Sequence, residues 1–219
     1  MWFALPDAPP DKLREALFSA EGLRRWWHPD TELNDGVLSP GIDAGGMVLH
    51  REGWTGDLVR VRFDVIRHEV EIVAAQLPYA ERRELSLAWQ VASATLGWSL
   101  ERRGPITWEC VDVPVALAYA DAWTRLAASE GIGSLAEGSR GTLKIAGARV
   151  LARARLVRPP RALVLELDGA LLRVALGPGD SVNAARADLL ASRPGVLPPE
   201  WRDWLKNRLG MAWESQLER

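Results

Sequence analysis

The sequence predicts an α+β protein built from two tandem units, each ordered as strand, two short helices, antiparallel strands and long helix. The first observation behind this prediction is that the hydrophobic pattern gives this order twice along the 219 residues. The second is a match in letters, because LFSAEGL (17–23) and LAASEGI (126–132) stand at equivalent places. Both observations favour an internal duplication, with units 1–104 and 105–219.

Paired tryptophans in the two long helices are a third sign of duplication. Trp89 and Trp98 stand nine positions apart in the first helix, and Trp204 and Trp213 stand nine apart in the second. One such spacing alone would be weak evidence, but it agrees with the element order. The join between the units falls at Arg103-Gly104-Pro105.

In the first unit, residues 1–5 form a short predicted strand. Apolar residues at helical spacing then predict two short helices ending near Trp27, with a break at Gly22. Residues 35–77 change to glycine-punctuated, partly alternating segments that predict strands. Residues 79–103 predict a long helix, because a proline precedes them, arginines lie late and Gly-Pro follows. Its apolar stripe consists of Leu85, Trp89, Ala92, Leu96 and Leu100.

The second unit repeats this order. A strand is expected over 106–113 and a helix over 116–131. Strand-like segments follow at 141–147, 149–157, 161–167 and 170–176, whereas 182–190 receives no firm assignment. Prolines open a second long helix over 198–219.

Composition excludes several classes of protein. Hydrophobic content of 47% with 26% charged residues is typical of a soluble globular chain. The net charge of −2 gives no basic field for nucleic acid, and the apolar run at 85–100 is too short and too polar to span a membrane. No secretory signal is visible at the N-terminus, and Cys110 stands alone. We therefore expect a cytoplasmic protein with no nucleic-acid partner and no membrane span.

The titratable residues give little support to catalysis. His28, His50 and His68 have no recognised metal-ligand spacing, so no metal or other cofactor is expected. His28 with Asp30 and Glu32 could act as an acid–base group near a pocket mouth, although a solvated loop is the favoured interpretation. The chain also lacks the strand-to-helix elbow of a serine nucleophile and the lysine of a phosphate loop.

Five arginines fall within RVLARARLVRPPR (149–161). Alternation places Arg149, Arg153 and Arg155 on one face of a strand and smaller apolar residues on the other. This pattern is typical of a half-buried strand with a charged outer face. Anion or nucleic-acid binding is the alternative, which the absence of neighbouring aromatic residues disfavours.

Two passages resemble a known superfamily. The first passage fits a motif at the end of the second short helix in START-like (SRPBCC) proteins, through Glu21, Gly22, Leu23 and Trp26-Trp27. The second unit has Ser134-Leu135 where the tryptophans of this motif would be expected. LVRPPRALVLEL (156–167) is similar to the strand, paired prolines and strand of the same family. The branch most similar contains the activator of a heat-shock chaperone ATPase and the polyketide cyclases. The resemblance implies a helix-grip fold in each unit, a curved antiparallel sheet around a long C-terminal helix with a cavity between them.

The eleven tryptophans are the candidates for lining such a cavity. Neighbours on a helix point about 100° apart, so of Trp26 and Trp27 one can enter the core while the other leans toward the mouth. Packing of both in the core is the alternative. The predicted ligand-binding residues are Trp26, Trp27, Trp54, Trp89, Leu96, Trp123, Trp201 and Leu205.

The function expected from these patterns is non-catalytic binding or sensing of a hydrophobic small molecule. No catalytic residue is assigned, and the interpretation leans away from an enzyme. Two alternatives stay open. One is a cyclase- or hydrolase-like enzyme of the same superfamily. The other is a co-chaperone-like interaction module, in which tryptophans of the last helix form a surface for a protein partner.

Overall fold

The computed structural model describes residues 1–27, 44–49, 59–74, 77–115, 119–128, 131–178, 183–192, 200, 201, 203, 204 and 207. The chain divides into two compact units, Met1–Arg103 and Gly104–Arg219, which are described one at a time. Their antiparallel sheets are separate, and the helices and strands together confirm the α+β class.

The first unit contains four strands and three helices among its described residues. The strands are β1 (Trp2–Ala4), β2 (Ala44–Leu49), β3 (Val59–Asp64) and β4 (Glu69–Val73), in the antiparallel order β1-β4-β3-β2. The helices are α1 (Pro10–Phe18), α2 (Ala20–Trp26) and α3 (Tyr79–Leu100). Along β3 the side chains alternate between buried and exposed, as the sequence pattern predicted.

The break between α1 and α2 falls at Ser19, so its predicted position at Gly22 is wrong. Ser19 caps α2, because its hydroxyl accepts a hydrogen bond from the Gly22 N–H at 2.9 Å. Gly22 is instead a buried residue inside α2, where a Cβ atom would lie 2.2 Å from the backbone oxygen of Glu15. Glycine is therefore needed for the close approach of two helices, and not for a turn.

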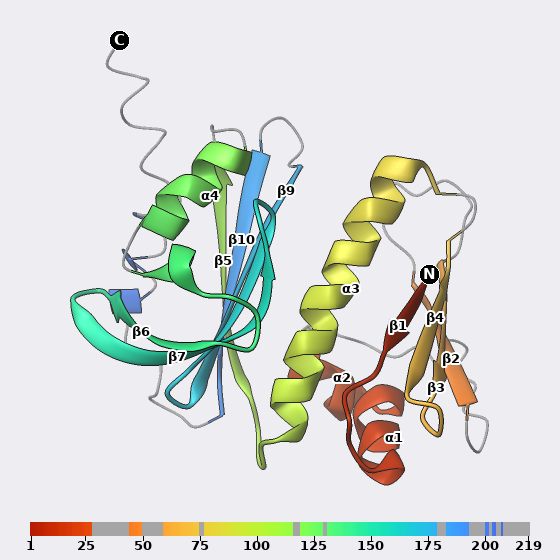
Figure 1. Ribbon diagram of the computed structural model, residues 1–219. Helices are drawn as coiled ribbons and strands as arrows, with labels where there is room; N and C mark the ends of the chain where they lie inside the picture. The colour runs from red at the N-terminus through yellow and green to blue at the C-terminus, as the bar shows by residue number, and fades with distance from the viewer. Residues whose placement is uncertain are drawn as a thin grey trace. The chain divides into compact units, whose positions relative to one another are not determined.

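The long helix α3 covers one face of the first sheet. Leu85, Trp89, Ala92 and Leu96 are buried in one cluster with apolar residues of β3 and β4, and Leu100 packs against that cluster. This confirms the stripe predicted for residues 79–103. Figure 1 shows α1 and α2 beside one end of α3. Arg25 of α2 identifies this as the C-terminal end, since it donates hydrogen bonds to the carbonyls of Ser99 and Arg102.

The second unit has a larger sheet. Its strands are β5 (Thr107–Val115), β6 (Arg140–Ile145), β7 (Ala148–Arg158), β8 (Ala162–Leu167), β9 (Ala170–Pro178) and β10 (Asn183–Ala191). They form the antiparallel order β5-β10-β9-β8-β7-β6. The helix α4 (Tyr119–Ala128) and the 3₁₀ turn η1 (Ile132–Ser134) connect β5 to β6. Most of segment 182–190, which had no firm assignment, belongs to strand β10, which lies between β5 and β9.

Side chains of the second sheet separate into two faces. Along β7, Val150, Ala152 and Ala154 are buried and Arg153 is exposed, as the alternation predicted. The inner face continues through β8 and β9 and packs against α4, Trp201 and Trp204. Of the predicted helix 198–219, residues 200, 201, 203, 204 and 207 are helical and the others lie outside the described residues.

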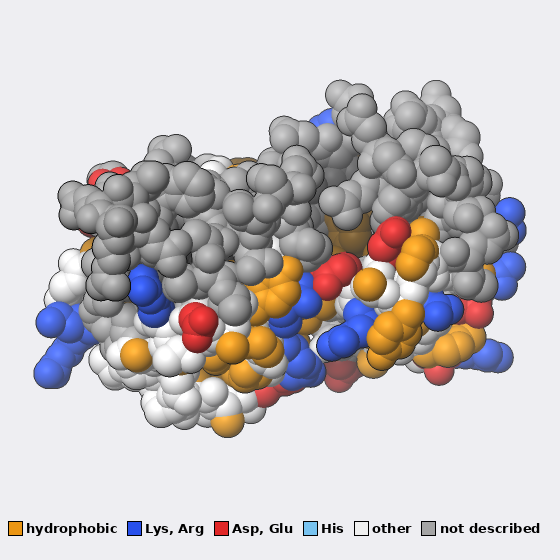
Figure 2. All heavy atoms as spheres, turned by 90° about the horizontal axis from the view of Figure 1, so that it is seen from above, with side chains coloured by type: hydrophobic (Ala, Val, Ile, Leu, Met, Phe, Trp, Pro, Cys, Tyr) orange, Lys and Arg blue, Asp and Glu red, His pale blue; other side chains and the backbone are white. Residues whose placement is uncertain are grey.

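Charged side chains of both signs are visible on the face of the molecule seen in Figure 2. Figure 2 shows lysine and arginine side chains on one face of the molecule, interspersed with acidic and hydrophobic ones. None of the described helices combines the length and apolarity required to cross a bilayer.

Candidate functional site

Three tryptophans of the first unit are in mutual contact. The rings of Trp26 and Trp27 have centroids 5.6 Å apart, those of Trp26 and Trp89 are 6.0 Å apart, and those of Trp27 and Trp89 are 5.6 Å apart. Trp26 and Trp89 are fully buried, whereas Trp27 is half-buried. The adjacent tryptophans thus enclose Trp89 from two sides, and only Trp27 retains substantial exposure.

Two phenylalanines complete this group around Trp89. Phe3 of β1 lies 6.3 Å from the Trp89 ring and Phe63 of β3 lies 5.9 Å from it. Tilted and edge-on arrangements of this kind are the favourable ones for aromatic pairs. We call Phe3, Trp26, Trp27, Phe63 and Trp89 the first-unit ring cluster. It fills the space between α2, α3 and the sheet, next to the buried Leu96.

The buried indole groups of this cluster differ in their hydrogen bonds. The Nε1–H of Trp26 donates to the backbone oxygen of Ala16 at 2.9 Å, which ties α2 to α1. The Nε1–H of Trp89 is buried and has no acceptor among the described residues. A buried donor without an acceptor lowers the stability of the fold. The Trp26 N–H therefore stabilises the first unit, whereas the Trp89 N–H destabilises it.

In the second unit, aromatic residues face the inner surface of the sheet. Trp201 and Trp204 are 7% and 8% exposed, and Tyr119 and the half-buried Trp123 of α4 pack against the same cluster. The Nε1–H of Trp204 is also buried without an acceptor in the described part of the chain. This cluster therefore contains a hydrogen-bond donor that its described neighbours leave unused.

The sheet face that packs against these aromatic residues is apolar and carries small side chains at several positions. Ala152, Ala154 and Ala170 present only methyl groups there, between larger side chains of the same face. The buried side chains that meet here are aliphatic, apart from the two tryptophans, and Tyr119 and Trp123 pack against them. The chemistry of this cluster is that of a hydrophobic surface with one buried N–H group.

The buried charges of the second unit lie on the other face of the sheet. Arg173 stands between Leu172 and Val174, which belong to the inner cluster, so alternation directs it outward. It donates to Asp188 of β10 from Nε at 3.0 Å and from a terminal nitrogen at 2.6 Å, and its guanidinium lies 4.7 Å from the Trp108 ring centre. Sequence reasoning missed this pair, although each charge interrupts an apolar strand.

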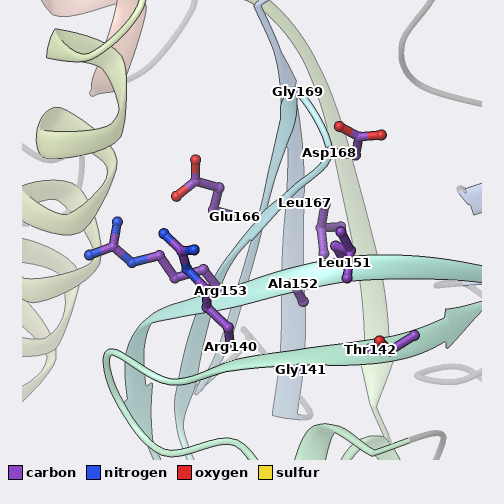
Figure 3. Close-up of a pocket in the computed structure, with 10 residues that line it drawn as sticks. All are labelled: Arg140, Gly141, Thr142, Leu151, Ala152, Arg153, Glu166, Leu167, Asp168 and Gly169. Carbon is purple, nitrogen blue, oxygen red and sulfur yellow. The ribbon is translucent and has the colours of Figure 1, made fainter.

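A surface groove of about 520 Å³ lies over β6, β7 and the end of β8. Its charged lining residues are Arg140, Arg153, Glu166 and Asp168, and Leu151, a lining residue from β7, is 74% exposed. Figure 3 shows Arg140 and Arg153 on the same side of the groove as Glu166. Thr142, Ala152, Leu167 and two glycines complete the lining.

Of the three histidines, the structure describes only His68. His28, His50, Asp30 and Glu32 lie outside these residues, so the acid–base hypothesis stays a prediction. His68 lies in the turn after β3, where its Nδ1 is 3.2 Å from the backbone oxygen of Pro6. In the part of the chain that the structure describes, no three His, Cys, Asp or Glu side chains gather as metal ligands would.

The predicted ligand-binding residues fall into two groups. Trp26, Trp27, Trp89 and Leu96 lie together in the first unit, and Trp123 and Trp201 lie together in the second. Trp54 and the side chain of Leu205 lie outside the described residues. Trp204 was not among the predicted liners. Its position three residues after Trp201 on the same helix could have indicated that the two tryptophans share a face.

No protein-family model and no curated protein matches the chain. Among solved structures, it is similar over its whole length to DynU16, a protein in the dynemicin biosynthetic locus, with 15% identity, 98% of that chain covered and a TM-score of 0.33. The di-domain ARO/CYC StfQ from the steffimycin biosynthetic pathway gives 13% identity, 100% and 93% coverage and a TM-score of 0.34.

Half of the chain is also similar to a solved dimeric protein. The Aha1 dimer from Colwellia psychrerythraea matches 49% of this chain and 98% of its own, with 10% identity and a TM-score of 0.36. TM-scores of this size leave the site and the function to be inferred from the residues of the chain itself.

Proposed function

We propose that the second unit binds a hydrophobic small molecule, without catalysing its conversion, between the inner face of its sheet and the helix that carries Trp201 and Trp204. The observation that carries this proposal is that the buried Nε1–H of Trp204 has no acceptor in the described part of the chain and belongs to a cluster with three alanines of the sheet. The Trp89 N–H also lacks a described acceptor, but it lies among four large aromatic rings. Native proteins seldom leave a buried donor unpaired unless another group pairs with it.

The apolar lining supports a hydrophobic ligand. Binding sites for small molecules are mostly apolar with a few polar groups that orient the ligand. The inner cluster supplies the apolar surface, and Ala152, Ala154 and Ala170 keep the side chains short at three positions of the sheet. The ligand we propose is a flat or aliphatic hydrophobic compound that carries one hydrogen-bond acceptor, such as a carbonyl oxygen, for the Trp204 N–H.

In the first unit, the proposal of ligand contact is confined to Trp27. Trp26, Trp89 and Leu96 are covered by their neighbours, whereas Trp27 keeps a half-exposed ring. The filled ring cluster supports the alternative that this unit acts through its surface, as an interaction module does.

We also propose that the two units are copies of one ancestral unit. In each, the first strand pairs antiparallel with the last strand of the sheet, β1 with β4 and β5 with β10. In each, helical segments follow the first strand. The copies would differ by one hairpin, since the first sheet has four described strands and the second has six. The cytoplasm is the proposed compartment because the sequence has one cysteine.

A pair of matched ligands tests the proposed site. 2-Acetylnaphthalene and 2-ethylnaphthalene have similar size, but only the first carries a carbonyl acceptor. Each is titrated against a neutral environment-sensitive dye bound to the full chain. We expect both to displace the dye, and Trp204→Phe to weaken binding of the acetyl compound by about 5-fold, as loss of one hydrogen bond of about 1 kcal/mol implies. The ethyl compound should be affected by less than about 2-fold.

The matched control is Trp89→Phe. It removes the same buried, unpartnered N–H from the first unit, so it should leave both ligands unchanged. An equal loss in both variants would refute the assignment to the second unit. Absence of dye binding in every variant would favour the interaction module. An enzymatic activity that collapses in His28→Gln would favour the enzyme alternative.

A further inference from the structure

The surface groove over β6 and β7 contains two arginines placed directly opposite each other. Arg140 of β6 and Arg153 of β7 are register partners in the antiparallel ladder, and both are exposed. Like charges at directly opposed positions repel, because their side chains emerge within about 5 Å of each other. This placement is unfavourable for the sheet itself.

Two neighbouring arginines of β7 form ion pairs, whereas Arg140 and Arg153 form none among the described residues. Arg155 binds Glu166 from Nε at 2.9 Å and from a terminal nitrogen at 2.8 Å, and Arg158 pairs with Glu137. Glu166 is also the register partner of Arg153, but its carboxylate accepts hydrogen bonds from Arg155. Within the described residues, neither the Arg140 nor the Arg153 guanidinium group has an ion-pair or hydrogen-bond partner.

An apolar side chain adjoins this pair of free guanidinium groups. Leu151 is 74% exposed, lines the same groove and lies two residues from Arg153 on β7, which corresponds to about 7 Å along a strand. Figure 3 places the two arginines toward one end of the groove and Leu151 toward the other. The groove thus offers two fork-shaped donors for an anion and, beside them, an apolar surface.

From this arrangement we infer that the groove over β6 and β7 binds a small amphipathic anion. Its phosphate or carboxylate group lies between the Arg140 and Arg153 guanidinium groups, and its short apolar body lies on Leu151. Arginine is the side chain best suited to bind such oxyanions with two parallel hydrogen bonds. Glu166 and Asp168 also line the groove and would repel a polyanion, so the ligand carries its charge at one end only.

This site is separate from the proposed hydrophobic site. The groove arginines project from the outer face of the sheet, whereas Ala152 and Ala154 of the same strand face the inner cluster. A ligand can therefore be assigned to one face or the other by the resonances that it shifts.

The test uses hexyl phosphate, hexanoate and methyl phosphate with the isotope-labelled full chain, and follows backbone amides and arginine Nε–H groups by NMR. Hexyl phosphate or hexanoate should shift resonances of β6 and β7. Arg153→Gln should weaken their binding at least about 10-fold, the factor for about 1.4 kcal/mol. Leu151→Ser should make hexyl phosphate bind no better than methyl phosphate. A response to hexyl phosphate alone would identify the head group as phosphate, and one to hexanoate alone as carboxylate.

The matched control is Arg149→Gln. Arg149 is another exposed arginine of β7, also opposite a cation, Lys144, but it does not line the groove. It should change the affinity by less than about 2-fold, and Trp204→Phe should leave it unchanged. Equal losses in Arg149→Gln and Arg153→Gln would show that only the general charge of the strand matters and would overturn the inference. So would shifts confined to inner-face resonances, or no shifts with any probe.

Discussion

Replacing Trp26 and Trp89 in turn by phenylalanine separates the contribution of the indole N–H group to stability from that of ring packing. Both rings are fully buried in the first-unit ring cluster, and both substitutions remove the same atoms. We estimate a common loss of about 1–2 kcal/mol from the buried carbons that each variant lacks. The two indole N–H groups then shift the totals in opposite directions.

Trp26→Phe also loses the 2.9 Å hydrogen bond to the Ala16 oxygen, which adds about 1 kcal/mol. Trp89→Phe instead removes a buried N–H with no described acceptor, which recovers about 1 kcal/mol or more. We therefore expect a cost of about 2–3 kcal/mol for Trp26→Phe and of about 0–1 kcal/mol for Trp89→Phe. A difference of about 2 kcal/mol corresponds to roughly 30-fold in the unfolding equilibrium.

Hydrogen exchange of amides in α3 measures this difference in the full chain, because these amides report on opening of the first unit alone. Amides of β8 and β9 serve as the internal control and should exchange at the wild-type rate in both variants. Equal costs for the two variants, or a larger cost for Trp89→Phe, would refute the assignment of the hydrogen bonds. By contrast, Trp89→Ala should cost about 3–5 kcal/mol, since it leaves a cavity among four aromatic rings.

Three further substitutions test other parts of the structure by urea denaturation. Gly22→Ala should destabilise the first unit by about 2 kcal/mol or more, because the alanine Cβ would lie 2.2 Å from the backbone oxygen of Glu15. A variant as stable as wild type would contradict the close approach of α2 to Glu15. Asp188→Ala should cost about 3–5 kcal/mol, because it removes the carboxylate that accepts two hydrogen bonds from the buried Arg173 guanidinium. Arg173→Leu combined with Asp188→Leu should be near neutral, and equal costs for the single and double variants would argue against a buried pair. Arg140→Gln should stabilise the second unit by a few tenths of a kcal/mol by removing a cross-strand repulsion, and a clear loss of stability would indicate an unrecognised favourable contact.

Most of the architecture could be predicted from the sequence because it follows from periodicity. The stripe of α3 and the alternation of β3 and β7 each place apolar residues on a buried face, which fixes their spacing. The stripe does not account for all of α3, which also buries Val91, Thr95, Trp98 and Ser99. The position of the α1–α2 break could not be predicted in this way. Glycine signals either a turn or a close approach, and only the packing of α2 on the Glu15 carbonyl decides between them.

Strand β10 was not assigned because its sequence carries charge in a buried position. Asp188 is only 2% exposed, and its partner Arg173 lies on the neighbouring strand β9. A local pattern has no information about a partner fifteen residues away. The pair becomes visible only when the register of β9 and β10 is known.

The sequence predicted several residues of the candidate site, but not how these residues contact one another. The sequence singled out Trp26, Trp27 and Trp89, and their mutual contact depends on how α2 meets α3. It also indicated the charged face of β7, yet Arg153 and Arg155 have the same local pattern. Their difference arises from a register shift at Arg155, between Ala154 and Leu156, and from Glu166 on β8.

Indole N–H resonances offer the most direct test of ligand binding in the second unit. Each tryptophan gives one such signal, and Trp204→Phe and Trp89→Phe identify two of them by loss of a peak. When 2-acetylnaphthalene is added to the full chain, the Trp204 signal should move progressively to the position of a hydrogen-bonded indole, while the Trp89 signal stays fixed. A Trp204 signal that does not move at saturating ligand, or one that moves no more than that of Trp89, would contradict the proposed function.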